Sequence, residues 1–211
     1  MELKKRIEKF KTREFETNKE FYLGIEKGQN PHTLFIGCSD SRVNAEILFQ
    51  ARAGELFQIR NVANIVPRDD DPDNNLSVVS ALEYAVKVLK VKNIIVCGHS
   101  NCGGCAAIRK LNDYKDDLPN TAEWISQSSR ISDYIDGKYP DMNEDNKLVL
   151  LEKLNAVRQL DNLLTYDFIR QAFDSRKLNL QAYYYDIGTG DISIYDYENE
   201  FSDLIKEIAL S

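Results

Sequence analysis

The chain has 211 residues, of which 43% are hydrophobic and 29% charged, and its formal net charge at pH 7 is −7. An acidic surface argues against nucleic acid as a partner, because phosphate binding needs a basic one. No apolar run approaches the roughly 18 residues that span a bilayer, and the charged N-terminus lacks the apolar segment of a secretory signal, so we expect a cytoplasmic protein without a membrane partner.

The first half of the chain alternates predicted helices and strands. A charged, helix-periodic stretch covers residues 1–30 and ends at "GQNP". The short apolar run "TLFIG" (33–37) is typical of a strand buried on both faces. A short helix around residues 45–50 and a strand "ELFQIR" (55–60) follow.

The next segments establish the fold class. "LSVVSALEYAVKVLK" (76–90) carries apolar residues on one helical face, and "NIIVCG" (93–98) is again an apolar strand. Strand, crossover helix and strand in succession predict an α/β fold with a parallel sheet between helices.

The second half is more helical. Leucine-rich spacing predicts a helix over residues 147–173, and two β-rich runs around "GTG" within residues 178–197 predict a hairpin. No linker rich in Pro, Gly or Ser divides the chain, so we expect a single domain.

Cysteine and histidine follow two of the predicted strands. Cys38 comes directly after "TLFIG", and His99 and Cys102 come after "NIIVCG". The carboxyl ends of parallel strands share one edge of a sheet, so these side chains can face one another. Two thiolates and an imidazole suit Zn²⁺, with the fourth position left to water or a carboxylate. The alternative is a buried, apolar role for Cys38, the role that we expect for Cys97 and Cys105.

"CSDSR" (38–42) adds chemistry that a structural zinc site does not need. Asp40 and Arg42 are two residues apart, so one loop can point both side chains the same way. A guanidinium can pair bidentately with a carboxylate and hold it ionised, either as a metal ligand or as a hydrogen-bond acceptor. The alternative is a surface ion pair of little consequence.

Together these motifs resemble the β-class carbonic anhydrases. The similarity runs through "GQNPHTLFIGCSDSRV", "GELFQIRNVANIVP", "ALEYAV" and "NIIVCGHSNCGG", and more loosely through "KLNAVRQLDNLLTYDF". The resemblance implies that one Zn²⁺ per chain is bound by Cys38, His99 and Cys102. Asp40 is then the fourth ligand or the partner of zinc-bound water, and Arg42 orients it. The implied CO₂ pocket, partly contributed across a dimer interface, consists of Gln29, Phe57, Val62, Tyr84 and Gly103.

The implied activity is that of a lyase: zinc-bound hydroxide attacks CO₂ and yields bicarbonate and a proton. His32 is a poor candidate for the proton shuttle, because it lies at the start of its strand. A bicarbonate-binding regulatory pocket of some family members matches only partly, at Phe35, Val43 and Arg60. Two alternatives stay open: hydrolysis of carbon disulfide or carbonyl sulfide on the same fold, and a non-catalytic, zinc-binding bicarbonate sensor.

For the architecture, the resemblance implies four parallel strands plus a C-terminal edge strand, flanked by helices. It implies a homodimer or a dimer of dimers, in which the long N-terminal helix packs on a partner subunit. The single domain, 1–211, would then consist of a helical arm (1–30), a zinc-site core (31–110) and a helical part that ends in the hairpin (111–211).

Overall fold

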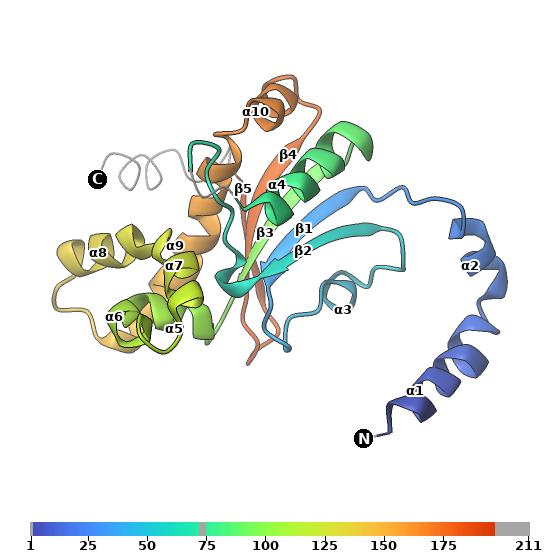
Figure 1. Ribbon diagram of the computed structural model, residues 1–211, viewed down its shortest axis with the longest axis horizontal. Helices are drawn as coiled ribbons and strands as arrows, with labels where there is room; N and C mark the ends of the chain where they lie inside the picture. The colour runs from blue at the N-terminus through green and yellow to red at the C-terminus, as the bar shows by residue number, and fades with distance from the viewer. Residues whose placement is uncertain (1, 72–74, 197–211) are drawn as a thin grey trace.

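A five-stranded sheet forms the centre of the computed structural model, which describes residues 2–71 and 75–196 (Figure 1). Its strand order is β2-β1-β3-β4-β5; the first four strands are parallel, and β5 runs antiparallel to β4. The strands are β1 (Thr33–Cys38), β2 (Leu56–Asn61), β3 (Asn93–His99), β4 (Asn179–Tyr185) and β5 (Ile192–Asp196). The predicted sheet is confirmed, although β2 begins and ends one residue later than expected. Residue 197, the last of the predicted hairpin, lies outside the described residues.

Helices connect and cover these strands. They are α1 (Leu3–Lys9), η1 (Phe10–Phe15), α2 (Lys19–Ile25), α3 (Ala45–Phe49), η2 (Val62–Asn64), α4 (Leu76–Glu83), η3 (Tyr84–Val88), α5 (Gly103–Arg109), α6 (Leu111–Tyr114), α7 (Pro119–Ser126), α8 (Ser129–Lys138), α9 (Glu144–Leu163) and α10 (Asp167–Asp174). Among the described residues, no helix combines the length and apolar character needed to cross a membrane.

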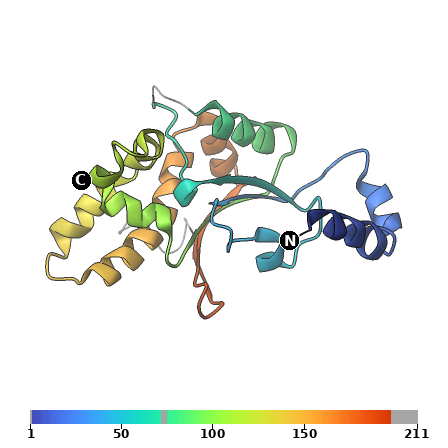
Figure 2. The same ribbon diagram turned by 60° about the horizontal axis from the view of Figure 1, so that its bottom comes forward.

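Side chains alternate across the strands, so the sheet has a core on each face. Leu34 and Ile36 of β1 pack with residues of α4, α9 and α10, whereas Phe35 packs with Val43 next to α3. Figure 2 shows α4 and α3 on opposite sides of the sheet. At Gly98 of β3 an added Cβ would lie 2.9 Å from a backbone oxygen of α9, so glycine permits this close approach of helix and strand.

A third apolar cluster lies beyond the carboxyl ends of β1 and β3. Isoleucines of α7 and α8 and leucines of α9 surround α5 there, and Cys38 and Cys102 belong to the same cluster. The helical second half therefore forms one wall of the strand ends that were expected to carry the site.

Two predicted helices are each interrupted. The helical segment near the N-terminus breaks between Phe15 and Lys19, where the Asn18 amide donates to the Glu14 carbonyl and competes with the helical backbone. The helix predicted over residues 147–173 ends at Leu163, because the Thr165 hydroxyl donates to a carbonyl of the last turn at 2.6 Å.

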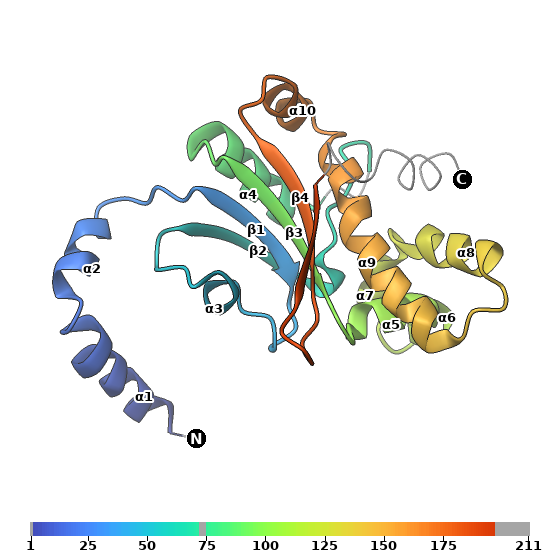
Figure 3. The same cartoon turned by 180° about the vertical axis from the view of Figure 1, so that it is seen from behind.

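The N-terminal helices α1 and α2 extend away from the sheet as an arm (Figures 1 and 3). Leu3 and Ile7 are 64% and 66% exposed, and Phe10 and Leu23 are exposed as well. The arm contacts the rest of the chain where the Arg52 guanidinium lies 3.6 Å from the centre of a phenylalanine ring of α2. These four exposed apolar side chains of the arm are therefore not covered within the described part of the chain.

Candidate metal centre

Three buried donor side chains meet at the carboxyl edge of the sheet. Cys38 is the last residue of β1, His99 is the last residue of β3, and Cys102 precedes the first residue of α5. The Sγ atoms of the two cysteines are 3.9 Å apart, and one donor atom of each of the three residues lies within 4.8 Å of the others. The parallel pairing of β1 with β3 thus places together residues that are far apart in the sequence.

The imidazole of His99 is oriented for a ligand. Its Nδ1 lies 3.0 Å from the carbonyl oxygen of Ser100, so this nitrogen carries the proton and donates it. The side chain is fully buried, and its Nε2 has no hydrogen-bond partner among the described residues. A buried imidazole lone pair beside two thiols fits Zn²⁺, and a second hydrogen bond that fixes the tautomer is typical of histidine ligands.

The thiols hold their protons firmly in the absence of a cation. The hydrogen bond with Cys102 and burial raise the pKa of Cys38 to about 12, and the neighbouring Cys105 thiol and burial raise the pKa of Cys102 to about 12. A cation that binds here must therefore displace two protons, so its affinity rises with pH.

Asp40 and Arg42 form the predicted bidentate pair. Arg42 Nε donates to Oδ1 at 2.9 Å and Nη2 donates to Oδ2 at 2.7 Å, and the Arg42 backbone N–H also donates to Oδ1. The guanidinium holds the pKa of the Asp40 carboxyl well below its usual range. Asp40 Oδ2 lies 3.9 Å from His99 Nε2, so an ionised oxygen faces the same point as the unpaired nitrogen.

Arg60 and Glu152 support this site, and the sequence analysis did not assign either role. Arg60 of β2 donates from Nε and Nη2 to the carbonyl of Cys38 and from Nη2 to the carbonyl of Asp40. Glu152 of α9 accepts the backbone N–H of Cys102 at 2.8 Å. Burial raises the pKa of Glu152, although its hydrogen bonds oppose that rise.

Glu152 belongs to a buried polar stripe on α9, together with Asn155, Gln159 and Asn162. Asn155 donates to the carbonyl of Ala63, and Gln159 and Asn162 bond the backbone of Val66. The spacing of three, four and three residues on an otherwise leucine-rich helix is the signal that could have revealed this stripe in the sequence.

The predicted CO₂-pocket residues do not come together within one chain. Gly103 follows Cys102 directly, and Val62 follows β2. Phe57 and Tyr84 contact each other elsewhere, with ring centres 6.0 Å apart. Gln29 precedes β1, whereas Cys38 ends it, and six extended residues separate the ends by roughly 17 Å.

Cys105 is buried in α5 beside Cys102, whereas His32 and Cys97 lie away from the donors. His32 precedes β1 and its Nδ1 lies 2.7 Å from the Thr33 hydroxyl, at the opposite end of the strand. Cys97 is buried on the α3 side of the sheet with Phe35 and Val43.

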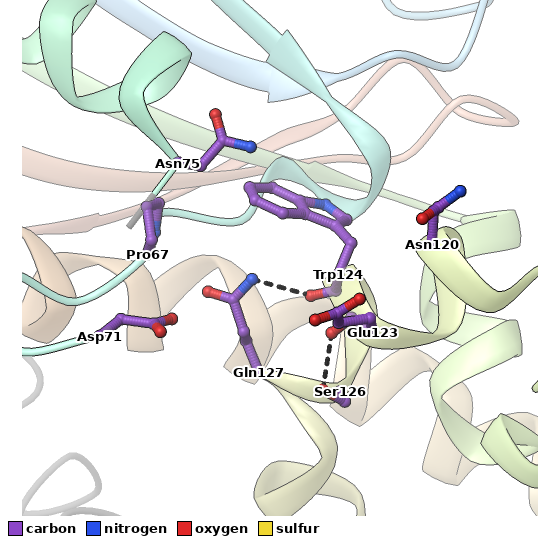
Figure 4. A pocket seen from close by; sticks show the side chains of 8 residues that line it. All are labelled: Pro67, Asp71, Asn75, Asn120, Glu123, Trp124, Ser126 and Gln127. Carbon is purple, nitrogen blue, oxygen red and sulfur yellow. Dashed lines mark hydrogen bonds between the residues drawn. The ribbon is translucent and has the colours of Figure 1, made fainter. Parts of the chain in front are cut away.

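Two neighbouring cavities share Trp124 and Asn75, and one of them reaches the site. One, of about 440 Å³, surrounds the Trp124 ring, with Pro67 and Asn75 opposite it (Figure 4). The second, of about 510 Å³, shares Trp124 and Asn75 with the first and extends to Ser39 and Val62. Trp124 Nε1 donates to the carbonyl of Val62 at 2.8 Å. The second cavity thus reaches the residue that follows Cys38.

Comparison with known proteins gives a consistent result. A family model described as carbonic anhydrase matches residues 33–192. A carbonic anhydrase of Helicobacter pylori (strain J99) is 38% identical over 201 residues, which cover 94% of this chain and 91% of the relative. A carbonic anhydrase of Pseudomonas aeruginosa is 36% identical over 188 residues, or 89% of this chain and 84% of the relative.

Solved structures agree in fold. The β-carbonic anhydrase CcaA superimposes with a TM-score of 0.88 at 32% identity and covers 92% of this chain and 93% of its own. A Coccomyxa β-carbonic anhydrase in complex with acetazolamide gives a TM-score of 0.78 at 31% identity, with 90% and 83% covered. A tetrameric β-carbonic anhydrase of Sordaria macrospora gives 0.75 at 30% identity, with 85% and 88% covered.

Proposed function

Because this chain belongs to the β-class carbonic anhydrase family, we propose that it binds one Zn²⁺ through Cys38, His99 and Cys102 and catalyses the reversible hydration of CO₂ to bicarbonate and a proton. The observation that carries the proposal is the unpartnered, fully buried Nε2 of His99 beside two thiols. When bound, Zn²⁺ supplies Lewis acidity, which lowers the pKa of water towards 7 and makes hydroxide available at neutral pH.

Asp40 and Arg42 perform the acid–base and orienting work in this proposal. The Asp40 carboxylate stays ionised because Arg42 neutralises it through two side-chain hydrogen bonds. It either completes the ligand set or accepts a hydrogen bond from water at the site and directs the oxygen lone pair towards CO₂. Arg60 keeps the loop in place by holding the backbone carbonyls of Cys38 and Asp40.

We further propose that the functional unit is a homodimer or a dimer of dimers. Gln29 precedes β1, at the end opposite Cys38, and the cavity that reaches Ser39 is lined by none of Gln29, Phe57 and Tyr84, so in this proposal a second copy supplies them to the CO₂ pocket. Tyr84 is 45% exposed and Phe57 packs beside it, as expected of residues that face a partner. The uncovered apolar side chains of the arm are suited to pack on that partner.

Bicarbonate regulation at Phe35, Val43 and Arg60 is not part of the proposal. Phe35 and Val43 are buried in the apolar cluster next to α3, and Arg60 already donates to two backbone carbonyls. The acidic net charge agrees with an enzyme that acts on a small molecule and not on nucleic acid, and we propose that it acts in the cytoplasm.

The decisive experiment measures zinc content and CO₂ hydration on the same preparation. We expect about one zinc per chain and stopped-flow rates far above background between pH 7 and 9. Carbon disulfide and carbonyl sulfide are assayed in parallel, and turnover of either without CO₂ hydration favours that hydrolase activity. Stoichiometric zinc without turnover of any of the three would refute the catalytic proposal and favour a sensor.

A further inference from the structure

One peptide unit of the metal loop, residues 100–102 between β3 and α5, is held from both sides. The carbonyl oxygen of Asn101 accepts from Arg42 Nη2 at 2.9 Å, and the N–H of Cys102, in the same peptide plane, donates to Glu152 Oε1 at 2.8 Å. Asn101 has a φ of 55°, in the left-handed region, where asparagine is more frequent than most residues. Because a peptide is planar, the two contacts together fix the tilt of this unit and the direction in which Cys102 leaves it.

The second oxygen of Glu152 is held as well. The hydroxyl of Tyr184 donates to Glu152 Oε2 at 2.9 Å, and the two residues are 5% and 1% exposed. The terminal torsion of a glutamate is broad, so one hydrogen bond alone does not define the plane of its carboxylate. Donors on both oxygens do define it. The Asn101 backbone N–H bonds the carboxylate as well, but removal of the Tyr184 hydroxyl would leave the buried Oε2 without this side-chain donor.

We propose that Tyr184 is a positioning residue of the metal centre. Its hydroxyl fixes the carboxylate of Glu152, which fixes the Asn101–Cys102 peptide and, through it, both the Cys102 thiolate and the guanidinium that holds Asp40. The proposal rests on the proposed function only in taking Zn²⁺ as the metal. It is specific to Tyr184, because its neighbour Tyr183 lies on the opposite face of the sheet, in the cluster next to α3.

A cavity beside Glu152 and Tyr184 offers an alternative donor to the tyrosine hydroxyl, namely water. About 320 Å³ in volume, it is lined by Glu152 and Tyr184 together with Ser100 and Asp186. A water molecule that entered from this cavity could replace the lost hydroxyl as a donor. In that case Tyr184 would be dispensable for the metal loop.

The test is zinc release from the zinc-loaded full chain to the chromophoric chelator 4-(2-pyridylazo)resorcinol. Loss of an outer hydrogen-bonding partner typically weakens metal binding 10- to 100-fold, and we expect Tyr184→Phe to accelerate release at least about tenfold. Tyr166→Phe is the matched control, since it removes another buried tyrosine hydroxyl. That hydroxyl donates to the Pro67 carbonyl at 2.8 Å and has no contact with Cys38, His99 or Cys102. Release from Tyr184→Phe within about twofold of wild type would overturn the proposal.

A second pair of variants tests whether Tyr184 acts on the metal centre through Glu152. If Tyr184 acts through Glu152, the change Tyr184→Phe adds nothing to zinc release in a Glu152→Gln background. An equal acceleration in both backgrounds would overturn the proposed connection.

The exchange rate of the Cys102 amide hydrogen, measured by NMR, needs neither zinc nor turnover. We expect it to rise about tenfold in Tyr184→Phe, the same factor as zinc release; an unchanged rate would count against the proposal even if the wild-type chain proved inactive towards CO₂. Failure of the proposed function and failure of this inference are therefore distinguishable.

Discussion

Replacement of Asp40 by alanine should separate catalysis from stability. The carboxylate oxygen lies 3.9 Å from His99 Nε2 and is the ionised acceptor at the site. A positioned acid–base group contributes roughly 10²- to 10⁴-fold to a rate, which corresponds to about 2.7–5.4 kcal/mol of the activation barrier. We therefore expect Asp40→Ala to lower kcat/KM for CO₂ at least about 100-fold.

The stability of the same variant should change little. The Arg42 side chain is 46% exposed, and an ion pair so open to water contributes little to folding. We expect the Tm to fall by less than about 4 °C and the zinc content to stay near one per chain, because Cys38, His99 and Cys102 are unaltered.

The chain contains a matched control for this experiment. Asp70 pairs with Arg68 in the same bidentate way, with Nε–Oδ1 and Nη2–Oδ2 distances of 2.8 and 3.1 Å and the same two-residue spacing, away from the donor cluster. Asp70→Ala should remain as active as wild type. A rate for Asp40→Ala within about threefold of wild type, with zinc retained, would show that Asp40 has no part in the reaction.

Three further predictions concern the metal, the packing and the pH dependence. Metal analysis should find little zinc in Cys38→Ser but about one zinc per chain in Cys97→Ala, because Cys97 lies in the apolar cluster next to α3. Equal zinc in both variants would argue against Cys38 as a ligand. Gly104→Ala should lose about 1–3 kcal/mol in urea unfolding, because its Cβ would lie 2.9 Å from the nearest side-chain carbon, while Gly137→Ala, with no atom within 4 Å, should not lose stability; a stable Gly104→Ala would contradict the tight packing. The pKa of Asp40 is depressed in the folded protein, so the stabilising effect of its carboxylate is present above about pH 4 and is lost only as the pH falls further. The Tm difference between wild type and Asp40→Asn should therefore be constant from pH 6 to 9. A slope in that window would disprove that Asp40 is ionised throughout it.

Strand positions and the meeting of the donor side chains were predictable from the sequence. "TLFIG" and "NIIVCG" are continuously apolar because β1 and β3 are covered on both faces. Parallel pairing then brings Cys38 and His99 to one edge whatever the intervening loop contains. This part of the prediction depends only on local pattern and on topology.

The supporting contacts were not predictable in this way. Glu152 meets the metal loop only because α9 packs against β3 and β4, and no local pattern specifies that contact. The break between the end of α9 and the start of α10 depends on Thr165. Its hydroxyl donates to a carbonyl of α9 and accepts the backbone N–H of Asp69 from a distant loop. Intrinsic helix propensity gives no indication of either partner.

The polar stripe of α9 also bears on how the protein is made. Fifty residues separate Cys102 from Glu152, and a ribosome needs roughly 3–10 s to add them. During that interval all three donor side chains already exist in the nascent chain, while the helix that holds the backbone around them does not. A cation that bound so early would meet an unfolded segment and could bind any of its four thiols, including those of Cys97 and Cys105, which are not in the donor cluster. Binding of the cation by the correct donors is therefore expected to be a late step, completed after β4 has been synthesised and α9 has docked on the sheet.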